Sequence, residues 1–174
     1  MKKTMLSVCF MVTASMAGNV QASDGTIHFT GNITDQTCTV DGASQALEVP
    51  MGNIGASALA GGAGTVASPT RFTLVLTGCP DTVTSATIKF DGDTENTVAG
   101  SGILKLDSDS TATGVGIVIS DNAGTPIAMH TDSPDYTLTT GDNDLLFTAR
   151  YIATGDTVTT GSANATSQFT INYK

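Results

Sequence analysis

The sequence predicts an all-β fold, and most simply a β-sandwich, from three observations. Apolar residues alternate with polar ones in several short segments, which is the period of a strand with one buried face. Turn signals rich in Gly, Asn and Asp separate these segments, as in Asp91-Gly92-Asp93 and Asp121-Asn122-Ala123-Gly124. No run of helical period is long enough to predict a helix. Many short strands with such turns are typical of a sandwich.

The last segment of the sequence shows the alternation most clearly. From position 165 the small or apolar side chains occupy every second place: Ala165, Ser167, Phe169, Ile171 and Tyr173. Gly161 precedes this segment, where a turn into the strand is expected. Because no residue follows Lys174, we expect one edge of this strand to keep its N–H and C=O groups open. We interpret this open edge as the functional feature of the chain.

A second alternating segment lies near the start, where Ile27, Phe29, Gly31 and Ile33 share one face of a predicted strand. Gly31 is unusual there, because glycine weakens the interior of a strand. It either marks a bulge in an ordinary first strand or a place where another backbone approaches closely.

The remaining segments are expected to supply the body of the sandwich. Residues 47–54 read as a short strand broken by Pro50, and residues 56–67, rich in Gly and Ala, read as a mobile loop. Further strands are predicted around these alternating or apolar runs: Phe72 to Leu76, Ala86 to Phe90, Ile103 to Leu106, Val115 to Ile119, Tyr136 to Leu138, and Leu145 to Ala153.

The first 22 residues have the features of a secretory signal peptide that is cleaved after Ala22. Lys2 and Lys3 form a positive start, and an apolar stretch follows from Met5 to Ala17. Val20-Gln21-Ala22 offers small residues at the cleavage site. The apolar stretch is shorter than the roughly 20 residues of a membrane span. We therefore expect an exported protein of one domain, residues 23–174.

The charge of the mature chain argues against nucleic acid as a partner. Five bases (Arg71, Lys89, Lys105, Arg150 and Lys174) and all sixteen acids remain after cleavage, so the net charge is 5 − 16 = −11. Such a surface repels phosphate backbones, and the sequence contains no cluster of bases.

Two cysteines, Cys38 and Cys79, remain in the mature chain once Cys9 leaves with the signal peptide. An even pair in an exported chain predicts a disulfide. A metal or redox site made of two thiols is the alternative, but the pair lacks C-x-x-C spacing.

The sequence offers no support for an enzyme, a metal site or a cofactor. His28 and His130 have no acidic or cysteine partner at metal-ligand spacing. The acidic loop at residues 91–96 lacks the glycine and the glutamate of a calcium loop. No motif for a nucleophile or for phosphate binding occurs. The scattered acids leave a carboxylate pair for glycoside hydrolysis open, without positive support for it.

Several motifs together resemble the major pilin subunits of chaperone–usher fimbriae, in particular the type 1 fimbrial major pilin family. The segment G-T-I-H-F-T-G at residues 25–31 and T-C-T-V-D at 37–41 are similar to the family's N-terminal extension and first cysteine. The segment F-T-A-R-Y-I-A-T-G at 147–155 resembles its penultimate strand. Gly161, fourteenth from the end, and Tyr173, next to last, match its C-terminal pattern.

This resemblance implies an incomplete immunoglobulin-like sandwich that lacks its C-terminal strand and is completed by donor-strand exchange. Residues 23–35 would be the N-terminal extension, with Ile27, Phe29, Gly31 and Ile33 as donor strand, and residues 36–174 the pilin domain. The groove edge and the chaperone-recognition site would include Gly161, Phe169, Ile171 and Tyr173.

The implied partners are other copies of the chain, a periplasmic pilus chaperone, an outer-membrane usher, and tip or adaptor pilins. The subunit would be exported through the periplasm to the cell surface and form the shaft of the fimbria. Two alternatives stay open: a minor or adaptor pilin of such a fibre, and a secreted carbohydrate-binding β-sandwich.

Overall fold

The computed structural model describes residues 27–31, 37–96 and 102–174. The chain divides into two units, residues 1–33 and 34–174. The signal peptide expected at residues 1–22 lies outside the described residues, and so does Ile33. Among the described helices, none has the length and apolar character needed to cross a membrane.

The first unit is described only at residues 27–31, and no strand is assigned there. The strand predicted for this segment is therefore not formed within the described chain. The side chains of Ile27 and Phe29 are 77% and 91% exposed. Large apolar side chains of a folded chain are seldom left so open, so the described part of this segment carries exposed apolar surface.

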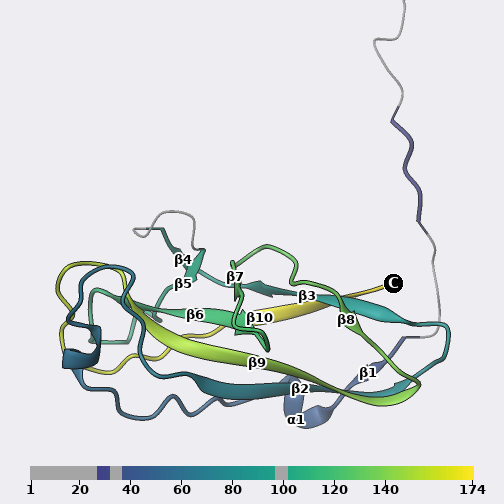
Figure 1. Ribbon diagram of the computed structural model, residues 1–174, viewed down its shortest axis with the longest axis horizontal. Helices are drawn as coiled ribbons and strands as arrows, with labels where there is room; N and C mark the ends of the chain where they lie inside the picture. The colour runs from purple at the N-terminus through teal and green to yellow at the C-terminus, as the bar shows by residue number, and fades with distance from the viewer. Residues whose placement is uncertain (1–26, 32–36, 97–101) are drawn as a thin grey trace, which may run out of the picture. The chain divides into compact units, whose positions relative to one another are not determined.

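Strands make up nearly all of the regular secondary structure of the second unit (Figure 1). The two helical elements are single turns, and Asp41 caps the first of them by accepting a hydrogen bond from the N–H of Ala43 at 2.9 Å. The elements in chain order are β1 (Thr39–Val40), α1 (Gly42–Gln45), η1 (Ala56–Leu59), β2 (Thr70–Cys79), β3 (Ser85–Asp91), β4 (Thr94–Glu95), β5 (Ile103–Leu104), β6 (Val115–Asp121), β7 (Pro126–Ile127), β8 (Tyr136–Thr137), β9 (Gly141–Ala153) and β10 (Gln168–Tyr173).

The strands form two sheets whose pairs are all antiparallel. One sheet has the order β1-β2-β9-β6-β5-β4, with β7 also paired to β6, and the other has the order β10-β3-β8. The long strands β2 and β9 pair from Thr70–Ala149 to Leu76–Asn143 before a register shift. In the small sheet, β10 pairs with β3 along its whole length and is an edge strand.

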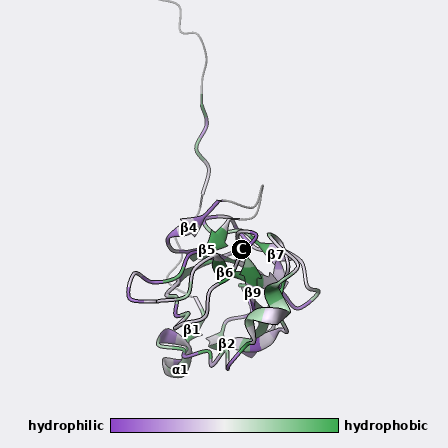
Figure 2. Ribbon diagram, turned by 90° about the vertical axis from the view of Figure 1, so that its left-hand side faces the viewer, coloured by the Kyte–Doolittle hydropathy of each residue, from purple (hydrophilic) through white to green (hydrophobic). Residues whose placement is uncertain are grey.

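The two sheets enclose one main core, so the unit is a β-sandwich as predicted. Phe147 of β9 is 1% exposed, and its ring centroid lies 5.4 Å from that of Phe72 of β2 and 5.2 Å from that of Phe90 of β3. Since β3 belongs to the other sheet, these three rings connect the two layers. Figure 2 shows apolar residues along β5, β6 and β9.

Four strand predictions are confirmed: those at Phe72–Leu76, Ala86–Phe90, Val115–Ile119 and Leu145–Ala153 fall within β2, β3, β6 and β9. Residues 56–67, expected to be a mobile loop, instead contain η1. Leu59 and Ala67 from this segment are buried in a second core with Val115 and Ala153. The apolar contacts of these two side chains, which the Gly-rich composition obscures, fix the segment.

Four other strand predictions are wrong in whole or in extent. The strands predicted at residues 103–106 and 136–138 form only at Ile103–Leu104 and Tyr136–Thr137. Residues 47–54 form no strand, and the final strand begins at Gln168 rather than at Ala165. These last two differences have one cause. A strand is assigned only where backbone hydrogen bonds form a ladder with a neighbouring strand, and neither stretch has such a neighbour on the side of the groove described in the next section.

The predicted disulfide is present between Cys38 and Cys79. It connects the residue before β1 to the last residue of β2, and both cysteines are buried in the main core. The bond closes a loop with a sequence separation of 41.

Replacing both cysteines with serine should lower the free energy of unfolding by about 4 kcal/mol, because the unfolded chain regains the entropy of the opened loop. Urea unfolding of the variant and of the reduced native chain should give similar midpoints, both well below that of the oxidised chain. An unchanged midpoint after reduction would show that the bond contributes little.

Candidate functional site: an unfilled groove

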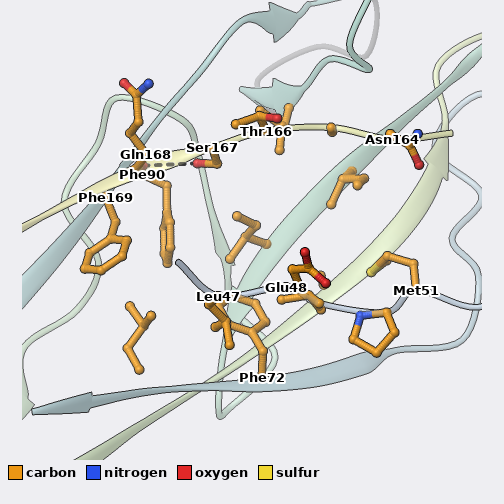
Figure 3. Close-up of a pocket in the computed structure, with 18 of the residues that line it drawn as sticks. Leu47, Glu48, Met51, Phe72, Phe90, Asn164, Thr166, Ser167, Gln168 and Phe169 are labelled. Atoms are coloured by element: carbon orange, nitrogen blue, oxygen red, sulfur yellow. Dashed lines mark hydrogen bonds between the residues drawn. The ribbon is translucent and has the colours of Figure 1, made fainter. Parts of the chain in front are cut away.

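A hollow of about 1100 Å³ opens along one side of the sandwich. One wall is the segment 45–52, and the opposite wall is the segment 163–169 that leads into β10 (Figure 3). Side chains from both sheets form the floor, which is mostly apolar: Phe72, Leu74, Phe90, Leu104, Ile117, Ile119, Ala149 and Tyr151. A hollow of this size beside the core is exceptional, because protein interiors are normally close-packed.

A second hollow of about 310 Å³ continues the first. The two share Gly52, Tyr151, Ala163 and Asn164 in their linings. The second is bordered by residues 52–54 on one side and by residues 158–164 on the other. Together they form a long groove with an apolar floor, and we call the whole of it the groove.

The wall at residues 161–173 presents alternate residues to the groove. The odd positions from Ala163 to Tyr173 are half-buried, whereas the even positions are exposed. This is the inward and outward alternation of a strand, and it continues upstream of β10 itself. The odd side chains are only half-buried because no strand covers them from the groove side.

The backbone of β10 leaves one edge open. The N–H of Lys174 donates to the C=O of Ser85 at 2.8 Å, and the N–H of Ser85 donates to the C=O of Lys174 at 3.3 Å. In an antiparallel ladder only alternate residues direct these groups at the partner strand. The even residues of β10 therefore bond to β3, and the N–H and C=O groups of Phe169, Ile171 and Tyr173 point away from it, to the open edge.

Upstream of β10 the same wall is held by side chains from residues 107–111. Ser162 N–H donates to Thr111 Oγ1 at 2.9 Å, and Asn164 N–H donates to Ser110 Oγ at 2.8 Å. Thr166 N–H donates to Asp107 Oδ1 at 3.1 Å. In the described chain, the N–H groups of Ala165 and Ser167 have no such partner. The open edge thus extends from Ala163, whose C=O accepts only the hydroxyl of Tyr151 among the described residues, to Tyr173.

The opposite wall is also unpaired. Residues 47–54, including Pro50, make no backbone hydrogen bond with any other described residue. Leu47 is exposed, and Met51 packs against the main core. A segment without ladder bonds beside an apolar floor is what remains when a strand between two neighbours is missing.

Gly161, one of the residues singled out from the sequence, lies in the lining of the second hollow. A Cβ there would lie 2.5 Å from the backbone N of Ala112 and in conflict with Thr111 Oγ1. Only glycine permits the wall to approach residues 111–112 this closely. Its role visible in the structure is therefore to position the start of the wall.

The other singled-out residues of this wall are distributed along the edge. Phe169 lines the groove, whereas Ile171 and Tyr173 lie further along β10 and pack against the main core. The hydroxyl of Tyr173 donates to the C=O of Cys38 at 3.3 Å. The structure thus places all three on the open edge but only Phe169 in the hollow.

Tyr151 was not identified from the sequence, yet it lies where the two hollows meet. Its hydroxyl donates to the C=O of Ala163 at 2.8 Å, so the floor is connected to the wall. Burial raises the pKa of Tyr151, so the hydroxyl remains a donor at neutral pH. In the sequence, the only signal for this contact is that Tyr151 carries a polar hydroxyl within a predicted strand.

The histidines add no chemistry to the groove. His28 is exposed, and His130 Nδ1 lies 2.9 Å from Asp91 Oδ1 on the surface. Within residues 27–31, 37–96 and 102–174, no cluster of three metal-ligating side chains is found.

Gly161→Ala should destabilise the second unit by about 1–3 kcal/mol, because the new methyl group forces the backbone away from residues 111–112. Gly155→Ala is the control, since a Cβ at Gly155 meets nothing within 4 Å. Urea unfolding of both variants measures the difference. Equal stability of the two would contradict the positioning role of Gly161.

The chain is similar to fimbrial subunits over its whole length. The family model described as fimbrial protein matches residues 27–174. The type-1 fimbrial protein subunit of Serratia marcescens is 37% identical, with 100% of each chain covered. The fimbrial subunit type 1 of Salmonella typhimurium is 34% identical, with 100% of this chain and 97% of that protein covered.

Solved structures agree with this assignment. A Burkholderia pseudomallei antigen and type I fimbria protein shares 40% identity at a TM-score of 0.61, covering 86% of this chain and 97% of that one. The P pilus rod subunit PapA shares 25% identity at a TM-score of 0.67, covering 79% and 99%. PapA has an immunoglobulin-like fold that lacks a strand. The chain therefore belongs to the fimbrial protein family and is a structural subunit of a pilus.

Proposed function

We propose that the groove of each subunit is filled by residues 25–33 of another copy, so that the subunits polymerise by donor-strand exchange into the shaft of a fimbria. In this proposal residues 1–22 are a cleaved signal peptide, residues 23–35 the N-terminal extension, and residues 36–174 the incomplete pilin domain. Ile27, Phe29, Gly31 and Ile33 face the floor of the acceptor groove.

The observation that carries the proposal is that the chain has both halves of such a contact, each without a partner among the described residues. The groove has an apolar floor and two unpaired backbone walls. Ile27 and Phe29 are large, apolar and open to solvent at alternate positions. A strand added at the wall 163–173 satisfies its N–H and C=O groups and brings alternate side chains onto the floor.

The lengths are compatible. The open edge from Ala163 to Tyr173 spans eleven residues, or about 36 Å at the rise of an extended strand. The nine residues 25–33 span about 30 Å on the same basis. The donor can therefore cover most of the edge without a turn.

The energies explain why such a subunit would need a partner. Burying Ile27, Phe29 and Ile33 contributes roughly 1.5–3 kcal/mol each. Each ladder hydrogen bond adds about 1 kcal/mol net. The sum is comparable with the roughly 5–15 kcal/mol by which whole domains are stable. A subunit with an empty groove is then marginal and liable to aggregate through its open edge.

A periplasmic pilus chaperone prevents this aggregation by inserting a strand of its own into the groove. At an outer-membrane usher, the extension of the next subunit then replaces that strand. The disulfide Cys38–Cys79 is consistent with passage through an oxidising compartment. Tip or adaptor pilins would occupy the end of the fibre. The chaperone would contact the open edge that contains Phe169, Ile171 and Tyr173, entering near Gly161.

Gly31→Val should abolish incorporation into fibres, because a branched side chain prevents the close approach of the donor backbone to the groove floor. In the free subunit a Cβ at Gly31 meets nothing within 4 Å, so the subunit itself should be unaffected. Thr30→Val, a near-isosteric change of the exposed neighbour, is the control. Fibre yield is measured by gel electrophoresis with and without boiling, and normal yield of the Gly31 variant would count against the donor role.

Tyr173→Ala should reduce co-purification of the subunit with its chaperone by about tenfold, since it removes a half-buried ring from the edge that the lent strand covers. Tyr173→Phe, which loses only the hydroxyl bonded to Cys38, should be captured almost normally. Unchanged capture of the Ala variant would refute the role of this edge residue.

A further inference from the structure

A row of side chains with opposite charges at its two ends lies on the outer face of β9. The odd residues Leu145, Phe147 and Ala149 belong to the main core, so the even residues point away from it. Read along the strand, these outward residues are Asp142, Asp144, Leu146, Thr148 and Arg150.

The neighbouring strand β2 extends this pattern. Its outward residues are Arg71, Thr73 and Val75, which pair in register with Thr148, Leu146 and Asp144 respectively. We call these eight residues of β9 and β2 the outer stripe. Arg71 and Arg150 make one end basic, Asp142 and Asp144 make the other acidic, and Leu146, 42% exposed, lies at the centre.

The two ends cannot neutralise each other within one subunit. Asp144 and Arg150 are six positions apart on one strand, about 20 Å. No acid of the described residues lies within 4 Å of Arg71 or Arg150, whereas Lys89 and Lys174 both have such partners. The Nε of Arg150 and the Oγ1 of Thr148 are also buried without a hydrogen-bond partner in the described chain.

We infer that the outer stripe binds the outer stripe of a second copy of this chain, face to face and with the strands antiparallel. The two-fold axis passes through Leu146, lies in the plane of the contact and is perpendicular to the strands. It brings Arg150 of each copy opposite Asp142 of the other. The same rotation brings Arg71 within side-chain reach of Asp144. The stripe is thus complementary to itself, as a two-fold contact requires.

This contact joins fibres rather than extending them. The inference depends on the proposed function, in which the groove already links copies head to tail into a fibre. A two-fold contact closes after two copies, so it connects a subunit of one fibre to a subunit of another. Its consequence is lateral association of fimbriae into bundles.

The size of the stripe shows why only fibres should associate. Eight side chains on two strands cover roughly 300–400 Å², estimated from the strand rise and spacing. A stable pair of globular proteins buries about 800 Å² on each partner. Single subunits should therefore remain monomeric through this face, whereas fibres repeat the contact many times and associate by multivalency.

The test compares the bundling of purified fibres by electron microscopy and by low-speed sedimentation. Native fibres should bundle at low salt and separate near 1 M salt, where the screening length is about 3 Å. Arg71→Glu with Arg150→Glu should form normal single fibres but need at least about tenfold more protein to bundle, because like charges now face each other. Asp142→Lys with Asp144→Lys should behave in the same way.

Mixing the fibres of the two charge-reversed variants should restore bundling, since an all-acidic stripe then faces an all-basic one. Lys105→Glu, a charge reversal at an exposed position outside the outer stripe, is the control and should leave bundling unchanged. Bundling that survives both reversals, or a mixture that stays dispersed, would overturn the inference. So would a changed fibre diameter without a change in bundling, which would place the contact inside a single fibre.

The outcomes separate this inference from the proposed function. Native chains that form no fibres would contradict donor-strand exchange. Native fibres that form and never bundle at low salt would contradict only the contact through the outer stripe.

Discussion

The missing ladder between residues 47–54 and 163–173 is the constraint on which the rest of the structure depends. Buried or half-buried backbone N–H and C=O groups require partners, and among the described residues these two walls lack backbone partners on the sides that face each other. The floor between them is the main core itself, shared by both sheets. Filling the groove therefore completes a ladder and a core at once, which explains how one added strand can affect the stability of the whole unit.

The walls are held in position before any strand enters. Side chains of residues 107–111 bond the backbone of the even residues 162–166, and Tyr151 bonds the C=O of Ala163 from the floor. The disulfide anchors the start of β1, and the hydroxyl of Tyr173 bonds the C=O of Cys38. Because these contacts order the acceptor in advance, less conformational entropy is lost when a strand binds. The aromatic contacts among Phe72, Phe90 and Phe147 keep the two layers together around the opening.

The sequence predicted the sandwich, the long strands and the disulfide because alternation and paired cysteines are local or countable signals. It also predicted the final strand, through the alternation from Ala165 to Tyr173. It could not show that Tyr151 contacts Ala163 or that Thr111 excludes a side chain at Gly161, since these contacts join distant positions. The strand predicted at residues 47–54 is absent because it has no neighbouring strand. Alternation in a sequence shows which face of a segment is buried, but it does not show whether a neighbour is present to complete the ladder.

The most direct test is to supply the missing strand within one chain. A second copy of residues 25–33, attached after Lys174 through a short Gly/Ser linker, can fold back along β10 as an antiparallel strand. If the groove lacks one strand, the free energy of unfolding in urea should rise by about 5 kcal/mol or more, and the chain should stop polymerising. Unchanged stability, with polymerisation intact, would show that the groove does not accept this segment and would contradict the account.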